Sequence, residues 1–168
     1  MKTLFIIFAL IFGFAFSISG QTTDKKEKQG TKQVEFARLK TLIKDKHYTF
    51  KSIWAYPQKG PMIDMINRSN ILKVNEDHGY GDLSYFGRAY SGGYSDDTGI
   101  EFDGPFESYN ADINDKKNKI TVRFRIKGSS DTYSCILTAS SFDNASLSVN
   151  SNNKQSIRYS GEINESEE

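Results

Sequence analysis

Residues 120–139 read ITVRFRIKGSSDTYSCILTA, two runs of alternating apolar and polar side chains joined by a short turn that begins at Gly128. The apolar positions of the first run are Ile120, Val122, Phe124 and Ile126. Those of the second run are Tyr133, Cys135, Leu137 and Ala139. A period of two is typical of antiparallel strands with one buried and one solvated face, so this stretch predicts a β-hairpin within a larger sheet.

The same alternation extends towards both ends of the chain. It recurs in residues 48–55, 100–102, 109–113, 145–149 and 157–163, and residues 62–65 and 71–74 are further short apolar pieces. Polar turns separate these runs at intervals of about ten residues, which is typical of a meander that forms a sandwich or a barrel.

Helical spacing occurs before the first of these runs, between Thr31 and Lys46. Its apolar stripe comprises Val34, Ala37, Leu39, Leu42 and Ile43. Lys and Arg fill much of the remainder, as on the exposed face of an amphipathic helix. We therefore predict a mainly β (α+β) domain, in which one N-terminal amphipathic helix is followed by an antiparallel β-barrel or β-sandwich of about seven to nine strands.

The beginning of the chain resembles a targeting segment. Lys2 precedes an almost unbroken apolar run from Leu4 to Phe16, and residues 17–20 are mostly small. This pattern predicts a secretory signal peptide over residues 1–20, because the run is short for a membrane span. We expect a flexible polar lead-in over residues 21–33, a single β-rich domain over 34–163 and an acidic tail over 164–168. The mature protein is then exported, periplasmic or extracellular, with no membrane span.

Charge and cysteine content narrow the functional classes. The chain has 22 Lys and Arg against 21 Asp and Glu, so the net charge is near zero and capture of nucleic acid is not indicated. Cys135 is the single cysteine, so packing and not an internal disulfide must hold the domain together. Its place in an alternating strand predicts a buried, inert thiol. A basic row on one strand, formed by Arg123, Arg125 and Lys127 with Arg158 as a possible addition, suits either an anionic polymer or a solvated strand that resists edge pairing.

Residues 78–104 differ from the rest because glycines alternate with aromatic residues. Glycine lets the backbone pass close to another surface, and tyrosine offers a flat ring with a polar tip. The candidate ligand contacts are Tyr80, Tyr85, Phe86, Arg88, Tyr90 and Tyr94. One interpretation is a binding loop displayed by the β scaffold. The other is a long irregular connection whose aromatic rings cover the end of the core.

Signals for catalysis or cofactors are weak. Asp77, His78 and Asp82 lie close in sequence but lack the ligand number and spacing of a zinc site. The sequence has no glycine-flanked nucleophile, phosphate-binding loop or dinucleotide fingerprint, so we predict no cofactor, no metal and no catalytic residue. A hydrolase is an alternative, because the glycine-rich segment contains several carboxylates and a catalytic pair of carboxylates is defined by their separation in the fold. The carboxylates of this segment are Asp82, Asp96, Asp97, Glu101 and Asp103.

Several strings resemble one known family. They are LSYFGRAY at 83–90, GIEFDGP at 99–105, DTY at 131–133 and NASLSVNSNN at 144–153, together with Tyr109. These resemble a family of exported proteins from Bacteroidetes whose name is domain of unknown function family 4251, and the resemblance covers most of the chain from Phe36. Ser84 departs from the proline that is usual there. The resemblance implies lineage and compartment, and it brings no activity.

These observations together predict a non-catalytic exported binding module, with a glycan, a small ligand or an envelope protein as its partner. The first alternative is a protein–protein interaction or inhibitor domain of the cell envelope. The second is a carboxylate-based hydrolase.

Overall fold

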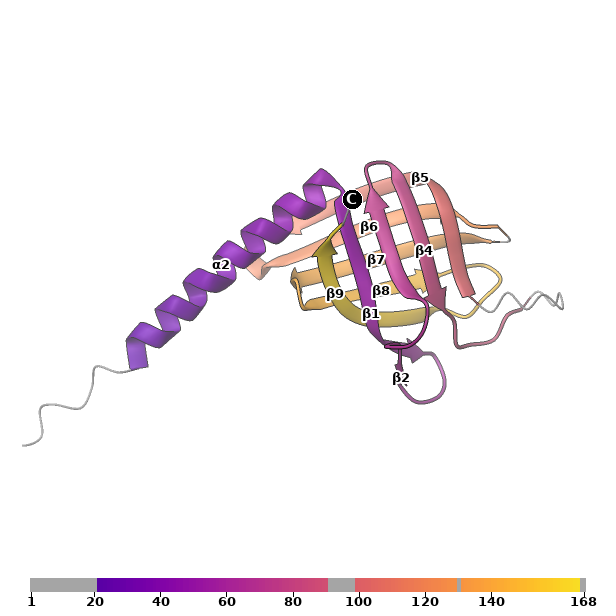
Figure 1. Ribbon diagram of the computed structural model, residues 1–168, viewed down its shortest axis with the longest axis horizontal. Coiled ribbons are helices and arrows are strands. Elements are labelled where there is room, and N and C mark those ends of the chain that lie inside the picture. Colours follow the sequence, from indigo (N-terminus) through magenta and orange to yellow (C-terminus); the bar gives the residue numbers. More distant parts are fainter. Residues whose placement is uncertain (1–20, 91–98, 130, 167–168) are drawn as a thin grey trace, which may run out of the picture. The chain divides into compact units, whose positions relative to one another are not determined.

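The structure is a computed structural model that describes residues 21–90, 99–129 and 131–166 (Figure 1). The chain divides into two units, residues 1–34 and residues 35–168. The described elements are the helix α2 (Gln21–Asp45), the 3-10 turn η1 (Asp115–Lys117), and the strands β1 (His47–Pro57), β2 (Ile63–Asp64), β3 (Asn70–Asn75), β4 (His78–Ser84), β5 (Gly99–Asn114), β6 (Lys119–Lys127), β7 (Thr132–Ser141), β8 (Asn144–Asn150) and β9 (Ile157–Glu165).

The strands form a closed antiparallel barrel. Each strand from β3 to β8 pairs with the next one along the chain, and β1 pairs with both β3 and β9. β2 is an additional short strand on the second half of β1, where Ala55 pairs with Ile63. The predicted mainly β fold with a leading helix is confirmed, and the pairing of the first strand with the last identifies the barrel instead of the sandwich.

β5 is the corner of the barrel because it changes partner halfway along its length. Its residues 99–105 pair with β4, and residues 106–114 pair with β6. A bulge between Phe106 and Ser108 marks the change, and bulges bend the strand that carries them. In Figure 1, β3 and β4 cross in front of the fainter strands β6 to β8. The sequence predicts two separate pieces here, since Gly104 and Pro105 interrupt the alternation, but they do not end the strand.

Aromatic rings fill the interior of the barrel. Phe124 lies between Phe102 and Phe106, with ring centroids 6.4 and 5.2 Å away. Phe102 also lies 5.8 Å from Tyr133, and the fully buried Tyr159 belongs to the same core. The inside of the barrel is therefore occupied by the protein's own side chains.

Two glycines of β4 make room for these rings. A Cβ on Gly81 would lie 2.6 and 2.7 Å from Cε1 and Cε2 of Phe102, and a Cβ on Gly79 would lie 2.6 Å from Cε1 of Phe106. Residues 78–84 and 99–104 are thus strands of the scaffold. The sequence prediction of a loop or irregular connection is wrong for them, because these glycines allow close packing inside a sheet instead of a turn.

The last part of α2 packs on the barrel end that carries the β5–β6 and β7–β8 turns. Phe36, Leu39 and Ile43 are spaced three and four residues apart and are buried in the core, which confirms an amphipathic helix. Val34 and Ala37 are exposed, contrary to the predicted stripe, since their angular positions fall outside the face that Phe36 defines.

Two further sequence predictions can be compared with the structure. α2 begins at Gln21 and not at Thr31, so the helix also includes residues 21–33, for which the sequence predicts a flexible lead-in. Lys, Glu and Gln are common there, and all three favour helix. Cys135 is buried on β7 as predicted, and burial raises the pKa of its thiol far above the ordinary value. The thiolate is the reactive form, so this cysteine is inert in the folded protein.

Candidate functional site

Tyr85 joins two loops at the end of the barrel where β4 stops. Its hydroxyl lies 3.0 Å from the carbonyl oxygen of Arg88 and 3.1 Å from that of Gln155. Its ring packs against the core, and Nζ of Lys154 lies 5.5 Å from the ring centroid. Burial raises the pKa of the Tyr85 hydroxyl, which therefore stays a hydrogen-bond donor. The segment after β4 is thereby fixed to the loop before β9.

Residues 88–90 pair with this loop as a short strand would. The amide of Tyr90 donates to the carbonyl of Asn153 at 2.7 Å, and the amide of Gln155 donates to the carbonyl of Arg88 at 3.0 Å. The side chains of Arg88 and Tyr90 remain exposed, Tyr90 by 66%. Main-chain bonds thus present these two side chains on the surface.

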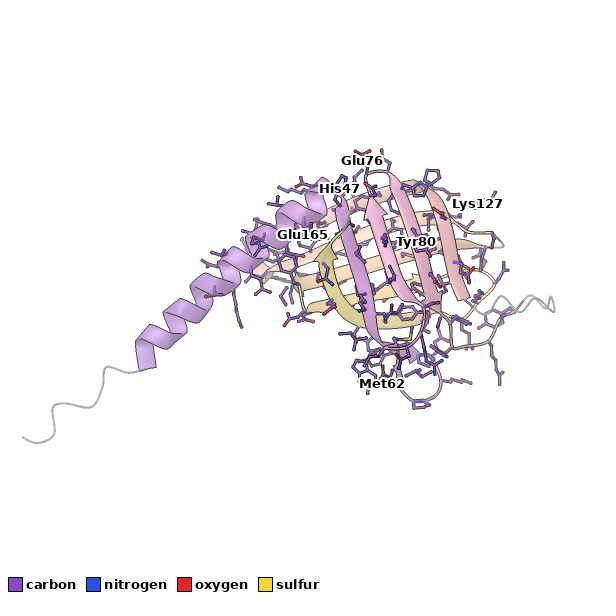
Figure 2. All side chains as sticks on the ribbon, in the orientation of Figure 1. His47, Met62, Glu76, Tyr80, Lys127 and Glu165 are labelled. Carbon is purple, nitrogen blue, oxygen red and sulfur yellow. The ribbon has the colours of Figure 1, made fainter. Side chains whose placement is uncertain are left out.

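The remaining predicted contacts are not all in one place. Phe86 packs partly against the core, with the guanidinium of Arg68 5.3 Å from its ring centroid. Tyr94 lies outside the described residues. Tyr80 is on the outer wall of β4, where 40% of it is exposed (Figure 2). The structure therefore brings Tyr85, Phe86, Arg88 and Tyr90 together at one end of the barrel and places Tyr80 elsewhere.

Tyr80 belongs to a groove on the outside of the barrel, which we call the outer groove. Its volume is about 790 Å³. It is lined by Tyr80, Gly81, Asp82, Glu101, Phe102, Asp103, Gly104, Pro105, Glu107, Lys127, Gly128 and Ser129. Tyr80 of β4 and Lys127 of β6, both labelled in Figure 2, line this groove.

The outer groove forms where β5 leaves its partner β6. Residues 99–105 of β5 pair with β4 only, since β6 ends at Lys127 and the chain turns into β7. The β6–β7 turn still passes close to β5, because a Cβ on Gly128 would lie 2.5 Å from the carbonyl oxygen of Glu101. The groove thus runs from the outer face of β4 across β5 to the β6–β7 turn.

Two carboxylates of the groove have nitrogen partners on neighbouring side chains. Nε2 of His78 lies 2.6 Å from Oδ1 of Asp103, and Nε of Arg125 donates to Oε2 of Glu107 at 2.8 Å. Both pairs are exposed, and such pairs contribute at most about 1 kcal/mol to stability. They fix the direction of two acidic side chains more than they stabilise the fold.

Asp82 and Glu101 have a different arrangement. They are directly opposite each other on β4 and β5, a register that places their Cβ atoms about 5 Å apart. Within the described parts of the chain, neither side chain forms a hydrogen bond or an ion pair. Their carboxylates therefore remain available as acceptors at the wall of the groove.

Several residues of this groove are among the candidates that the sequence indicates. Asp82, Glu101 and Asp103 are among the carboxylates that it singles out, and Tyr80 is a predicted contact. The other two acidic candidates, Asp96 and Asp97, lie outside the described residues. Lys127 was assigned to a basic row, and no sequence signal connected it with β4 and β5.

Other candidate sites change once the strands are placed. Arg158 is on β9, which β7 and β8 separate from β6, and its guanidinium lies 4.4 Å from the ring centroid of Tyr56, so it does not extend the basic row. Asp77 contacts Nζ of Lys46 at 2.6 Å, whereas His78 contacts Asp103. Over the ranges that the structure describes, no three His, Cys, Asp or Glu side chains converge as metal ligands would. No helix in those ranges has the length and hydropathy that a membrane-spanning helix needs.

Comparisons with known proteins identify the family. Residues 30–163 match the model of a family described as domain of unknown function, DUF4251. The fold is similar to the crystal structure, at 1.95 Å resolution, of a DUF4251 family protein from Bacteroides eggerthii DSM 20697. That comparison has a TM-score of 0.63 and 20% sequence identity, and it covers 82% of this chain and 91% of that chain. No curated protein matches the sequence. The resemblance found in the sequence is confirmed, and the chain belongs to the DUF4251 family.

Proposed function

We propose that this protein is a non-catalytic binding module that takes a hydroxyl-rich ligand, such as a glycan, in the outer groove. The observation that carries the proposal is the position of the exposed Tyr80 ring beside the carboxylates of Asp82 and Glu101 in a groove of about 790 Å³. The apolar segment at residues 4–16 supports an exported protein, so we propose an envelope or extracellular glycan as the ligand.

The chemistry of the groove suits such a ligand. Known small-molecule sites have volumes of about 300–1,000 Å³ and combine an apolar surface with a few converging polar groups. The Tyr80 ring offers a flat face for the C–H surface of a sugar, and ionised carboxylates accept hydrogen bonds from hydroxyls. The interior of the barrel is occupied by Phe102, Phe106 and Phe124, which leaves the outer wall as the place for a ligand.

A docked peptide strand is a weaker alternative at the same place. An uncovered strand edge can pair with another chain, and natural sheets prevent this with charged residues and proline. The part of β5 that β6 leaves carries Glu101, Asp103 and Pro105, all exposed. This edge therefore has the features of one protected against strand addition, which favours a ligand without a peptide backbone.

The test is a glycan array followed by calorimetry on the best binder. We expect Tyr80→Ala to lower the affinity by about fivefold or more, because loss of one stacking contact costs about 1 kcal/mol or more. Tyr90→Ala is the matched control, since Tyr90 is more exposed and lies outside the groove. If Tyr90→Ala abolishes binding and Tyr80→Ala does not, the site is at the end of the barrel and the outer groove is wrong.

A second candidate function is a carboxylate-based hydrolase, and the opposition of Asp82 and Glu101 supports it. Glycosidases use two carboxyl groups about 5 to 9 Å apart, a range that side chains on directly opposite residues can span. Incubation with the bound glycan, followed by product analysis, separates the two functions. Product formed by the native chain and lost in both Asp82→Asn and Glu101→Gln would establish the hydrolase.

A further inference from the structure

A second hollow adjoins the outer groove, and we call it the hairpin pocket. Its volume is about 370 Å³, and it lies between the β6–β7 turn and the loop that joins β8 to β9. Lys127, Gly128 and Ser129 line both hollows. The two hollows are therefore neighbours that share residues 127–129 as a common wall.

The backbone between the two hollows is held firmly in place. The amide of Gly128 donates to the carbonyl of Asp131 at 2.8 Å, which closes the turn. On its other side, Gly128 packs against the carbonyl of Glu101 so closely that a Cβ would lie 2.5 Å from that oxygen. Gly128 thus anchors the turn against β5, and the three residues from Lys127 to Ser129 form a wall that both hollows share.

The hairpin pocket has hydrogen-bonding groups that do not line the outer groove. Asn152 and Asn153 provide amides, and Thr132 provides a hydroxyl. Oδ1 of Asp131 accepts from the amide of Thr132 at 2.8 Å, and Oδ2 is a buried acceptor without a donor among the described residues. The main chain at Asn153 is fixed by its bond to the amide of Tyr90, so the pocket wall is ordered.

We propose that the ligand of the outer groove is a chain of several units, which crosses the β6–β7 turn and places further units in the hairpin pocket. This inference rests on the proposed function and specifies its ligand class as an oligomer instead of a single sugar. The continuity of the two hollows carries it, because Lys127, Gly128 and Ser129 line both of them. The segment at residues 88–90 then has a positioning role, since it holds the loop that forms the pocket.

The experiment measures how affinity depends on ligand length. The probes are β-1,4-linked oligomers of glucose, of N-acetylglucosamine and of glucosamine, each from monomer to hexamer, with binding measured by calorimetry. We expect the affinity of the binding series to increase by about tenfold or more between dimer and hexamer. Thermal melting of every variant verifies that it is folded.

Matched variants assign the gain to the hairpin pocket. Asn152→Ala removes an exposed amide that lines the pocket, and we expect it to lower hexamer affinity about fivefold while dimer affinity is unchanged. Asn150→Ala is the control, because Asn150 is exposed and lines neither hollow. Tyr80→Ala weakens both lengths. Equal affinities for dimer and hexamer, with no effect of Asn152→Ala, would overturn the inference and leave the groove site intact. If no oligomer binds, the proposed function itself fails, and the inference fails with it.

Discussion

Replacing Gly81 with alanine tests whether the barrel interior is full. The new Cβ would lie 2.6 and 2.7 Å from two ring carbons of Phe102, whereas ordinary contacts between such atoms are longer than 3.4 Å. The ring has little freedom to move away, because Phe124 and Tyr133 lie 6.4 and 5.8 Å from it, centroid to centroid. The substitution therefore forces either the ring or the strand out of position.

The size of the effect follows from these contacts. Overpacking a filled core costs about 1–3 kcal/mol, and we expect about 3 kcal/mol here because several ring atoms of Phe102 are affected at once. For a domain of this length that corresponds to a fall in Tm of about 10 °C. Gly104→Ala is the control: a Cβ there meets no atom within 4 Å, and its unfolding free energy should change by less than about 0.5 kcal/mol.

Urea unfolding followed by circular dichroism gives the free energies. A double variant then assigns the cost to the ring. Phe102→Leu alone removes ring volume and destabilises the protein. In the Gly81→Ala background it also relieves the overlap. The destabilisations of the two single variants should therefore sum to more than that of the double variant, by about 1 kcal/mol or more. If Gly81→Ala alone leaves stability unchanged, the interior has spare volume. The argument that a ligand must bind outside the barrel would then lose its basis.

Three further predictions concern side chains in the core or packed against it. Cys135 should react with a thiol reagent only after unfolding, because burial raises the pKa of its thiol, and rapid reaction of the native protein would contradict this. Burial also raises the pKa of the Tyr159 hydroxyl, so the unfolded chain loses the hydroxyl proton at a lower pH than the folded protein. The contribution of this group to stability is therefore complete below about pH 10 and falls above it. Urea midpoints measured at increasing pH will show this fall. Tyr85→Phe removes a hydroxyl within hydrogen-bonding distance of two carbonyl oxygens, so it should lower the free energy of unfolding by about 1 kcal/mol and accelerate amide hydrogen exchange at Tyr90. Unchanged exchange would mean that the two loops stay joined without this hydroxyl.

Alternation predicted the strands whose inward positions are apolar and failed where they are not. Ile120 to Ala139 gave the correct hairpin because every second side chain is apolar and buried. β4 was missed because its inward positions include Gly79 and Gly81, and their space is filled by rings from β5. A sequence pattern records the side chain at each position, and it contains no sign that a neighbouring strand supplies the missing volume.

Closure of the barrel was beyond local pattern for a similar reason. The sandwich and the barrel have the same alternating strands, and they differ in whether β1 pairs with β9. That pairing joins Tyr48 to Glu165 and Pro57 to Ile157, residues from opposite ends of the domain. A bulge between Ser52 and Trp54 adjusts the register, and nothing in those residue types announces it.

The sequence indicates some residues of the candidate site, because their types are distinctive. It does not indicate which of them lie together, because their partners are remote in the chain. Tyr80, Asp82 and Glu101 were all singled out from the sequence, yet only the β4–β5 register places Asp82 opposite Glu101. Lys127 is the last residue of β6, and it lines the groove because β5 bends away from β6 at this point. Exposed and buried aromatic residues also look alike in sequence, so Tyr85 and Tyr80 received the same interpretation although one joins loops and the other lines the groove.

The bend of β5 connects the core of this barrel with its outer surface. β5 carries Phe102 and Phe106 on its inner side, and its residues 99–105 have no partner on β6. The outer groove lies where the pairing of β5 with β6 stops. Glu101 and Asp103 flank Phe102 in the strand, so a displaced ring must move the groove wall as well. Under the proposed function, filling the space at Gly81 should therefore weaken ligand binding as well as stability, whereas substitutions on the outer faces of β7 and β8 away from both hollows should affect neither. Such coupling would allow a barrel with a filled interior to carry the proposed site, because the packing of its core sets the shape of the groove outside.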